Sequence, residues 1–360
     1  MKKIVKKILS VLLILVLLPV ASATILITTL AITEHRPDEV ELTAIANNQT
    51  TRVPLNQSIK VMTFNTGYSA LSKDEDFVMD GGKKTRPDSM TVIQNNLTAI
   101  KQVVSSQQAN ILFLQEVDIS SKRSYFVDQL KAYETLLDHQ SISYAPNFRV
   151  LFVPFPFSIG NMIGKVESGI VTASSYEVSS AARIQLPGEF AWPVRLANLK
   201  RALLVFRLPI EGSDKELILI NGHLSAYDDG TMRSQEMNRL REFMIFEYQK
   251  GNYIVVGGDF NQTFPEADGV FPIVDSTYYV APVIADDFLP EGFSFVIDLT
   301  LPTCRLLDKP YNPLDPLTQY YLIDGFIVSS NIQIQSVSTL NLGFENSDHN
   351  PVTMEIVLLP

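Results

Sequence analysis

Side chains that can bind metals or transfer protons stand at the ends of several short apolar runs in this chain. Each run is typical of a buried strand, and each ends at an acid, an amide or a histidine. A lone carboxylate at a buried strand end is unfavourable unless it is paired or binds a metal. Each residue alone has an ordinary structural explanation, but their recurrence favours one shared site. The residues are Asn65, Glu116, His223, Asp259, Asn261, Asp324, Asp348 and His349.

The types of these side chains indicate hydrolysis of a phosphate ester. Oxygen atoms of Asn, Asp and Glu are hard ligands that suit Mg²⁺ or Mn²⁺ better than zinc. Two histidines beside carboxylates can transfer protons near neutral pH. The single cysteine, Cys304, is expected to be a small buried apolar residue. The chain lacks HExxH, GxSxG and GxxxxGK[ST], which argues against zinc-peptidase, serine-hydrolase and nucleotide-triphosphatase chemistry.

The elements that must position these residues are predicted from apolar spacing. Apolar residues recur with helical period in 90–104 and 231–248. The runs 202–208 and 216–222 suit a hairpin. We expect an α/β domain over residues 59–360, with two packed sheets and helices outside, and a linker over the polar residues 34–58. The predicted strands are 59–65, 110–117, 202–208, 216–224, 253–261, 321–329 and 352–359.

The N-terminal residues 1–33 predict a membrane anchor or a signal segment. Four lysines precede 26 uncharged residues, 8–33, which is enough to cross a bilayer core. Ala21-Ser22-Ala23 resembles a signal-peptidase site, but the apolar run continues beyond it. We favour an uncleaved single-pass anchor in the cell membrane over a secreted, cleaved form. Lysines before the span place the N-terminus inside and the remainder outside the cell.

The charge of the exported part bears on its partners. Four of the 29 Lys and Arg precede the span, so 25 basic residues face 39 acidic residues and the net charge is −14. Such a surface does not attract nucleic-acid phosphates through its overall field, although it permits a local basic cleft. We infer no obligate protein partner from the sequence.

The ordered motifs resemble those of a known superfamily. TFNTG, LQEVD, NGHLSA, GGDFNQT, LIDGFIVS and SDHNPV occur in this order. Together they resemble the endonuclease/exonuclease/phosphatase superfamily, which has the DNase I-like fold, over about residues 59–360. The resemblance implies a four-layered α/β sandwich, with two packed mixed β-sheets flanked by helices and the site at the top of the sheets.

The resemblance also implies roles for the matching residues. Asn65, Glu116 and Asp348 match residues around the metal, which is expected to be Mg²⁺ or Mn²⁺. The implied reaction is in-line attack of water on phosphorus. Either His349 or Asp259 could take the proton of the water. The other implied roles are positioning of water and phosphate by Asp259 and Asn261, contact of His223 with the phosphate or leaving group, catalysis by His349, and orientation of His349 by Asp324.

The NGHL motif with His223 departs from the abasic-site repair branch and resembles the DNase I, sphingomyelinase and phosphatase branches.

Three further residues are weaker candidates for substrate binding. Glu167 is a candidate for the second metal-linked glutamate of the DNase branch, with a loop acid before a strand as the favoured alternative. Arg201 and Arg305 are candidates to bind a phosphate by charge alone, with surface solvation as the favoured alternative.

Three substrate hypotheses follow. The first is an extracellular nuclease acting on DNA. The second is a phosphodiesterase of phospholipid head groups, like a sphingomyelinase, in which the loop 152–158 (FVPFPFS) contacts lipid. For that loop we favour packing of Phe152, Phe155 and Phe157 inside the domain. The third is a catalytically silent anchored binding domain, which would not need the full set of acids and histidines.

Overall fold

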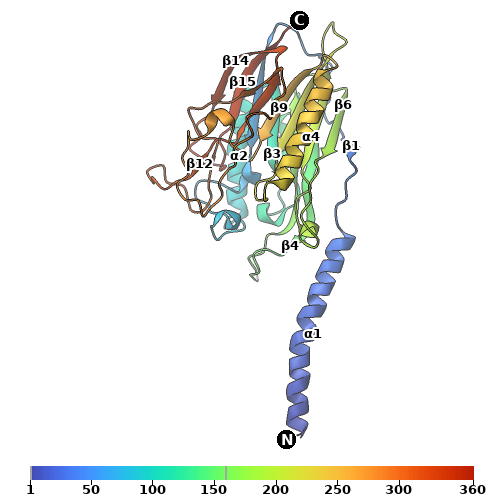
Figure 1. The fold of residues 1–360 in the computed structure, drawn as a ribbon, viewed down its shortest axis with the longest axis vertical. Coiled ribbons are helices and arrows are strands. Elements are labelled where there is room, and N and C mark those ends of the chain that lie inside the picture. Colours follow the sequence, from blue (N-terminus) through green and yellow to red (C-terminus); the bar gives the residue numbers. More distant parts are fainter. Residues whose placement is uncertain (1, 159) are drawn as a thin grey trace.

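Figure 1 shows a long N-terminal helix attached to a layered α/β domain. This computed structural model describes residues 2–158 and 160–360. The helices are α1 (Lys2–Ile32), α2 (Met90–Gln107), α3 (Gln129–Leu136) and α4 (Thr231–Tyr248). The strands are β1 (Val40–Leu42), β2 (Ser58–Asn65), β3 (Ile111–Asp118), β4 (Ser141–Val153), β5 (Gly164–Ser174), β6 (Ser180–Gln185), β7 (Ala202–Pro209), β8 (Glu216–His223), β9 (Tyr253–Asp259), β10 (Phe293–Val296), β11 (Cys304–Arg305), β12 (Tyr320–Tyr321), β13 (Asp324–Ser329), β14 (Ile332–Thr339) and β15 (Val352–Leu358).

Two mixed sheets form the centre of the domain. Over the described residues, one sheet has the order β1-β6-β7-β8-β9-β13-β10 and the other β14-β15-β2-β3-β5-β4. The pairs β2–β3 and β8–β9 are parallel, and their neighbours in each sheet are antiparallel. Fully buried Phe113, Phe206 and Phe326 pack between the sheets. Burial of large aromatic side chains is a main source of stability in such an interface.

Helices cover the outer face of each sheet: α2, with the shorter α3 beside it, covers one, and α4 covers the other, as Figure 1 shows for α2 and α4. Leu97 and Ile100 of α2 belong to the same buried cluster as Met62 of β2. Leu240 and Met244 of α4 join the cluster on the outside of the other sheet. The result is four layers, helix, sheet, sheet and helix. The predicted DNase I-like sandwich, with two mixed sheets flanked by helices, is therefore confirmed.

The observed helices and strands agree with most predicted ranges. They differ where one predicted strand is interrupted and where strands were not predicted. The helices begin at residues 90 and 231, and β7 and β8 form the expected hairpin. The run 321–329 is interrupted, because β12 pairs with β11 in a small separate sheet while β13 joins β9. β4, β5, β6 and β14 were not predicted, since polar residues interrupt their apolar pattern.

Residues 34–58, predicted as a linker, pack against the domain instead. β1 pairs antiparallel with β6 and forms the edge of the first sheet. Val53 is fully buried and bridges to Ile210. Backbone pairing at a sheet edge needs no apolar period on the pairing strand, so composition alone does not show it.

Helix α1 is long and apolar enough to span a membrane or to act as a signal sequence. It leaves the domain as a single long helix at the end opposite the C-terminus (Figure 1). β15 leads to the C-terminus and runs antiparallel to β2, so Asn65, at the last residue of β2, lies toward the α1 end. The predicted chemistry therefore faces the same end of the domain as the helix.

Candidate active site

The polar strand ends of both sheets surround one cavity of about 730 Å³. The second sheet supplies Asn65 and Glu116, and the segment before β15 supplies Asp348 and His349. The first sheet supplies His223 and Asp259, with Asn261 just beyond. Asp324 lies behind His349 rather than on the cavity surface. The residues predicted from strand ends thus come together across the gap between the two sheets.

Asp259 is the centre of the polar part of this cavity, which is formed by the strand ends listed above and is called the floor. Asn65 Nδ2 donates a hydrogen bond to Asp259 Oδ2 at 3.0 Å, and the Asn261 amide donates to Asp259 Oδ1 at 2.8 Å. His223 Nε2 and His349 Nε2 lie 3.4 and 3.8 Å from Asp259 Oδ2. Burial and the adjacent charge of Asp324 raise the pKa of Asp259, which makes its carboxylate a stronger base.

The two histidines beside Asp259 have opposite electrostatic environments. Burial opposes protonation of His349, but Asp324, Cys304 and Asp348 together outweigh it and raise the pKa of His349 well above its ordinary value. His349 Nδ1 donates to Asp324 Oδ2 at 2.8 Å. Burial and the nearby cation of Arg201 lower the pKa of His223 well below its ordinary value. Titrating groups whose pKa values are pushed apart suit separate acid and base roles.

Several backbone positions around the site adopt the left-handed conformation, which is unfavourable for residues other than glycine. Glu116 has φ 56° at an irregularity in the β3–β5 pairing, and Asn261 has φ 50°. Left-handed non-glycine residues persist only where the surroundings hold them, and they are common at functional sites. Gly67 has φ 51°, and a Cβ there would lie 2.8 Å from Asp348 Oδ1. Only glycine therefore leaves room for the Asp348 carboxylate at this turn.

The residues predicted to hold a metal fit a hard divalent cation. Burial raises the pKa of Glu116 above its ordinary value, against the opposing effect of Arg123 and His349. Burial also raises the pKa of Asp348, to about 7, and the charge of Glu116 adds to this effect. Both carboxylates line the cavity beside Asn65. Their ionised forms are disfavoured without a cation, and a divalent ion between them would relieve that penalty.

Further acidic and histidine groups adjoin this position. Ligand atoms of Asp259, Asp324 and His349 lie within 4.8 Å of one another, as do those of Cys304, Asp348 and His349. Cys304 is buried, and burial raises the pKa of its thiol to about 12. A thiol held neutral is a poor metal ligand, so the carboxylates are the better candidates.

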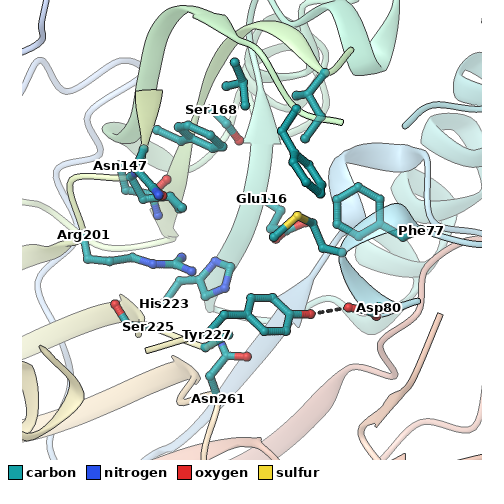
Figure 2. Close-up of a pocket in the computed structure, with 18 of the residues that line it drawn as sticks. Phe77, Asp80, Glu116, Asn147, Ser168, Arg201, His223, Ser225, Tyr227 and Asn261 are labelled. Carbon is teal, nitrogen blue, oxygen red and sulfur yellow. Dashed lines mark hydrogen bonds between the residues drawn. The ribbon is translucent and has the colours of Figure 1, made fainter. Parts of the chain in front are cut away.

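Arg201 lines the cavity with its guanidinium directed at His223 (Figure 2). Its Nη1 is buried and has no hydrogen-bond partner within the described part of the chain. Burial lowers the pKa of Arg201, against the opposing charges of Glu236 and Glu116. A buried N–H donor without a partner is unfavourable, and an anionic oxygen in the cavity would satisfy it. The favoured expectation of surface solvation was therefore wrong for Arg201.

The other two weaker candidates have different surroundings. Arg305 also lines the cavity and is 1% exposed; it donates to the backbone carbonyls of Ser72, Leu306 and Lys309, and its buried Nε has no partner among the described residues. Surface solvation was therefore also the wrong expectation for Arg305. Glu167 lies on β5 near Arg149 and Lys165, at 3.4 Å from each, and its neighbour Ser168 faces the cavity instead. Neighbouring strand residues point to opposite faces, which places Glu167 away from the site.

Several polar residues of the site were not predicted. Asn147, on β4, lines the cavity with a buried Nδ2 that lacks a partner among residues 2–158 and 160–360. Below the floor, Gln115 Nε2 donates to Asn221 Oδ1 at 2.8 Å and joins the two sheets. Gln115 belongs to the motif LQEVD and Asn221 to the motif NGHLSA, so these motifs contained the signal for this contact. Nothing in the sequence around Asn147 indicated its role.

Other unpredicted contacts hold the edge of the cavity. The Tyr227 hydroxyl donates to Asp80, which connects two loops that both line the cavity (Figure 2). Ser225 donates from its amide and hydroxyl to the buried carboxylate of Glu236 on α4. These contacts fix the loop that follows His223.

One side of the cavity is apolar and includes the N-terminal helix. Leu26 and Ile27 of α1 line the cavity together with Phe155 and Phe157 of the β4–β5 connection. Phe155 is 39% exposed and Phe157 is 87% exposed. The expectation that the three phenylalanines of this loop pack inside the domain was therefore wrong for Phe155 and Phe157, whereas Phe152 is half-buried. This apolar side is called the wall below.

Comparisons with solved structures show proteins of similar fold. An endonuclease/exonuclease/phosphatase from Beutenbergia cavernae has a TM-score of 0.56 at 16% identity, covering 84% of this chain and 72% of that one. The human Nocturnin catalytic domain with bound sulfate has a TM-score of 0.51 at 17% identity, covering 88% and 97%. TDP2 of D. rerio with a single-strand DNA product has a TM-score of 0.52 at 12% identity, covering 84% and 99%.

Sequence comparison gives the family directly. No curated protein matches the chain. The sequence profile described as the Endonuclease/Exonuclease/phosphatase family matches residues 62–349, which include every residue of the floor. The chain belongs to this family, whose members hydrolyse phosphoester bonds and depend on a metal ion.

Proposed function

We propose that the chain is a Mg²⁺-dependent phosphodiester hydrolase, with Mn²⁺ as a substitute, whose catalytic domain is exported and tethered to the membrane. The observation that carries the proposal is the pair of histidines around Asp259, one held cationic by Asp324 and the other held neutral by burial and Arg201. Acid and base groups of fixed and different protonation are what hydrolysis of a stable diester requires. A silent binding domain would not need this arrangement.

The roles follow from the contacts of each residue. Glu116, Asp348 and the oxygen of Asn65 would hold the metal, which when bound neutralises charge on the phosphoryl oxygens. Asp259, with its raised pKa and its hydrogen bond from the Asn261 amide, orients the attacking water and accepts its proton. His349, oriented by Asp324, donates a hydrogen bond toward the leaving oxygen. This assignment takes Asp259, rather than His349, as the base.

The remaining donors suit the substrate phosphate. Arg201 presents an unpartnered, buried Nη1 to the cavity, and Asn147 presents an unpartnered Nδ2. His223, as a neutral ring, completes the set on the same side. Fixed donors in a buried site stabilise the charge that develops on phosphoryl oxygens without having to reorganise.

The decisive experiment is an assay of the full chain in detergent with bis(p-nitrophenyl) phosphate, a soluble diester, in Mg²⁺ or Mn²⁺. His223→Ala and His349→Ala should each lower kcat by at least about 10²-fold. His139→Ala is the matched control, because His139 is an exposed histidine away from the cavity. Turnover that persists in a chelator, or that survives both active-site substitutions, would contradict the proposal.

The tether is tested separately from the chemistry. α1 and the four lysines at its start fit an anchor with the catalytic domain outside the cell. Mature protein in the culture medium that begins near Thr24 would show a cleaved signal instead. Protein retained in the membrane with an intact N-terminus is the expected result.

DNA is the second candidate substrate. The observation that favours it is the fold shared with TDP2, which was solved with a single-strand DNA product. The net charge of −14 on the exported part opposes it. Plasmid DNA is therefore included in the assay beside lipid and soluble diester, and cleavage of DNA with no cleavage of lipid would favour this candidate.

A further inference from the structure

Side chains of the anchor helix α1 form part of the boundary of the cavity that contains the floor. Ala23, Leu26, Ile27 and Leu30 of α1 line it, at a position where the rest of the boundary is made by the catalytic domain. These four side chains offer only hydrocarbon. A soluble, charged diester gains nothing from such a surface, whereas a hydrocarbon chain does.

The apolar surface continues from the helix onto two loops. Phe155 and Phe157 precede β5, and Trp192 and Val194 lie in the connection between β6 and β7. All four are exposed, and Trp192 is the single tryptophan of the chain. The loop after β4 extends from the domain on the side where α1 emerges (Figure 1). Exposed aromatic residues beside a membrane span are typical of side chains that enter the interface of a bilayer.

An ion cluster fixes the helix against this part of the domain. Glu34 follows α1, and its carboxylate lies 3.2 Å from Lys200 Nζ and 3.5 Å from Arg195 Nε. Arg36 adds a third cation at 2.9 Å. Glu34 and Lys200 are almost fully buried. These ion pairs join the residues directly after α1 to the catalytic domain, and they therefore hold the helix part of the wall against the domain.

The position of the wall along α1 corresponds to the outer edge of the bilayer. About 20 residues of helix cross the hydrocarbon core, so a span that begins after Lys7 reaches the outer boundary near Ile27. The cavity thus opens where the acyl chains of outer-leaflet lipids meet their head groups. At that level the phosphodiester of a lipid is the group nearest the floor.

We propose that the substrate is a phospholipid of the outer leaflet, whose head-group diester reaches the floor while one hydrocarbon chain lies against Leu26 and Ile27 of the anchor helix. This inference rests on the proposed phosphodiester hydrolysis and names its substrate class. Water attacks phosphorus, one P–O ester bond breaks, and the leaving oxygen takes a proton. The products are a phosphomonoester and an alcohol, one of which keeps the hydrocarbon chains.

Charge supports this choice over a nucleic acid. The unpartnered donors that line the cavity, on Arg201, Arg305 and Asn147, suffice for one phosphate group. A nucleic acid would need cations along several successive phosphates. Leu26, Ile27, Phe155 and Phe157 occupy one side of the cavity instead. A single phosphate joined to a hydrocarbon chain matches both halves of this surface.

The test uses full-length protein in vesicles of phosphatidylcholine, phosphatidylglycerol and sphingomyelin. Lipid hydrolysis is followed by mass spectrometry of the products, and bis(p-nitrophenyl) phosphate is assayed in the same vesicles. Ile27→Trp, which fills the wall, should lower the ratio of lipid rate to soluble-diester rate by at least about tenfold. Ile25→Trp is the matched control, since Ile25 lies on the same helix, is 67% exposed and does not line the cavity. It should leave both rates within about twofold of the original.

Quenching of Trp192 gives a readout that does not depend on turnover. Lipids brominated near the head-group end of the acyl chain should quench its fluorescence more than lipids brominated at the chain terminus. Soluble-diester hydrolysis without lipid hydrolysis, an unchanged ratio in Ile27→Trp, or no quenching by either lipid would overturn the inference and leave the proposed function standing. Loss of soluble-diester hydrolysis itself would instead refute the proposed function.

Discussion

The floor and the wall of the cavity differ in how their side chains are held. Floor residues lie at strand ends of two sheets, are buried except for half-buried Glu116, and take their positions from hydrogen bonds such as Asn65 to Asp259. Wall residues come from the N-terminal helix and two connections, and the rings of Phe157 and Trp192 are largely exposed. On the proposed function, the rigid sheets would position the chemical groups, and segments outside the sheets would select the molecule that reaches them.

The largest expected effect comes from the centre of the floor. Asp259→Asn keeps the size of the side chain but removes its negative charge and its ability to accept a proton. We expect kcat on bis(p-nitrophenyl) phosphate to fall by about 10³-fold or more. Asp138→Asn, at an exposed position, is the control and should leave kcat unchanged. A comparable kcat in Asp259→Asn would show that the floor is not the chemical part of the cavity.

Arg201 tests the side of the floor that faces the phosphate. Arg201→Met retains much of the side-chain volume and removes the buried donor that lacks a partner. A charge-assisted hydrogen bond is worth about 1.5–3 kcal/mol, so kcat/KM should fall by about 10- to 100-fold on soluble diester and lipid alike. Because the substitution also removes a buried unpaired group, the midpoint of thermal unfolding should not fall. A loss confined to lipid would instead assign Arg201 to the wall.

A wall substitution should have a smaller and more selective effect. Phe157→Ser removes an exposed ring without disturbing the core. Full burial of such a ring in an apolar phase is worth about 1.5–3 kcal/mol, and partial insertion should change the lipid rate by about three- to tenfold. The soluble-diester rate measured beside it shows whether the loss is selective. Equal losses on both substrates would erase the distinction between floor and wall.

The smallest effect is expected at the seat of the anchor helix. Burial opposes ionisation of Glu34, but Lys200, Arg36 and Arg195 outweigh it and bring the pKa of Glu34 below its ordinary value of 4.5. Ionised Glu34 therefore stabilises the fold above that pH, and the contribution disappears as pH falls through the lower folded-state pKa. Glu34→Gln should cost about 1 kcal/mol of unfolding free energy at pH 7. The difference from the original protein should vanish in acid, and a difference that persists there would assign the loss to packing.

The sequence was a better guide to the floor than to the wall. Short apolar runs that end in polar residues reveal strand ends, and parallel neighbours such as β2 and β3 bring those ends together. This is why Asn65, Glu116, His223 and Asp259 could be assigned to one site. The roles of these residues are still predictions, because only their positions have been observed.

The wall could not be predicted because it depends on contacts between distant segments. Ile27 and Phe157 lie far apart in the chain and line the same cavity only in the folded protein. An exposed phenylalanine has the same sequence signature as one that faces a core, and so Phe155 and Phe157 were wrongly expected to be buried. Arg201 was named as a candidate to bind a phosphate, but the burial of its Nη1 was not predicted, because that burial results from packing of other segments around it.

The short connection between α1 and β1 has a consequence for where the enzyme can act. Seven residues, 33–39, separate the end of the helix from the first strand, and even fully extended they reach only about 25 Å. Once anchored, the domain can search the surface in two dimensions but cannot leave it. Its turnover would then follow the surface density of substrate in its own membrane, independent of dilution of the cells, and would not extend to a neighbouring cell.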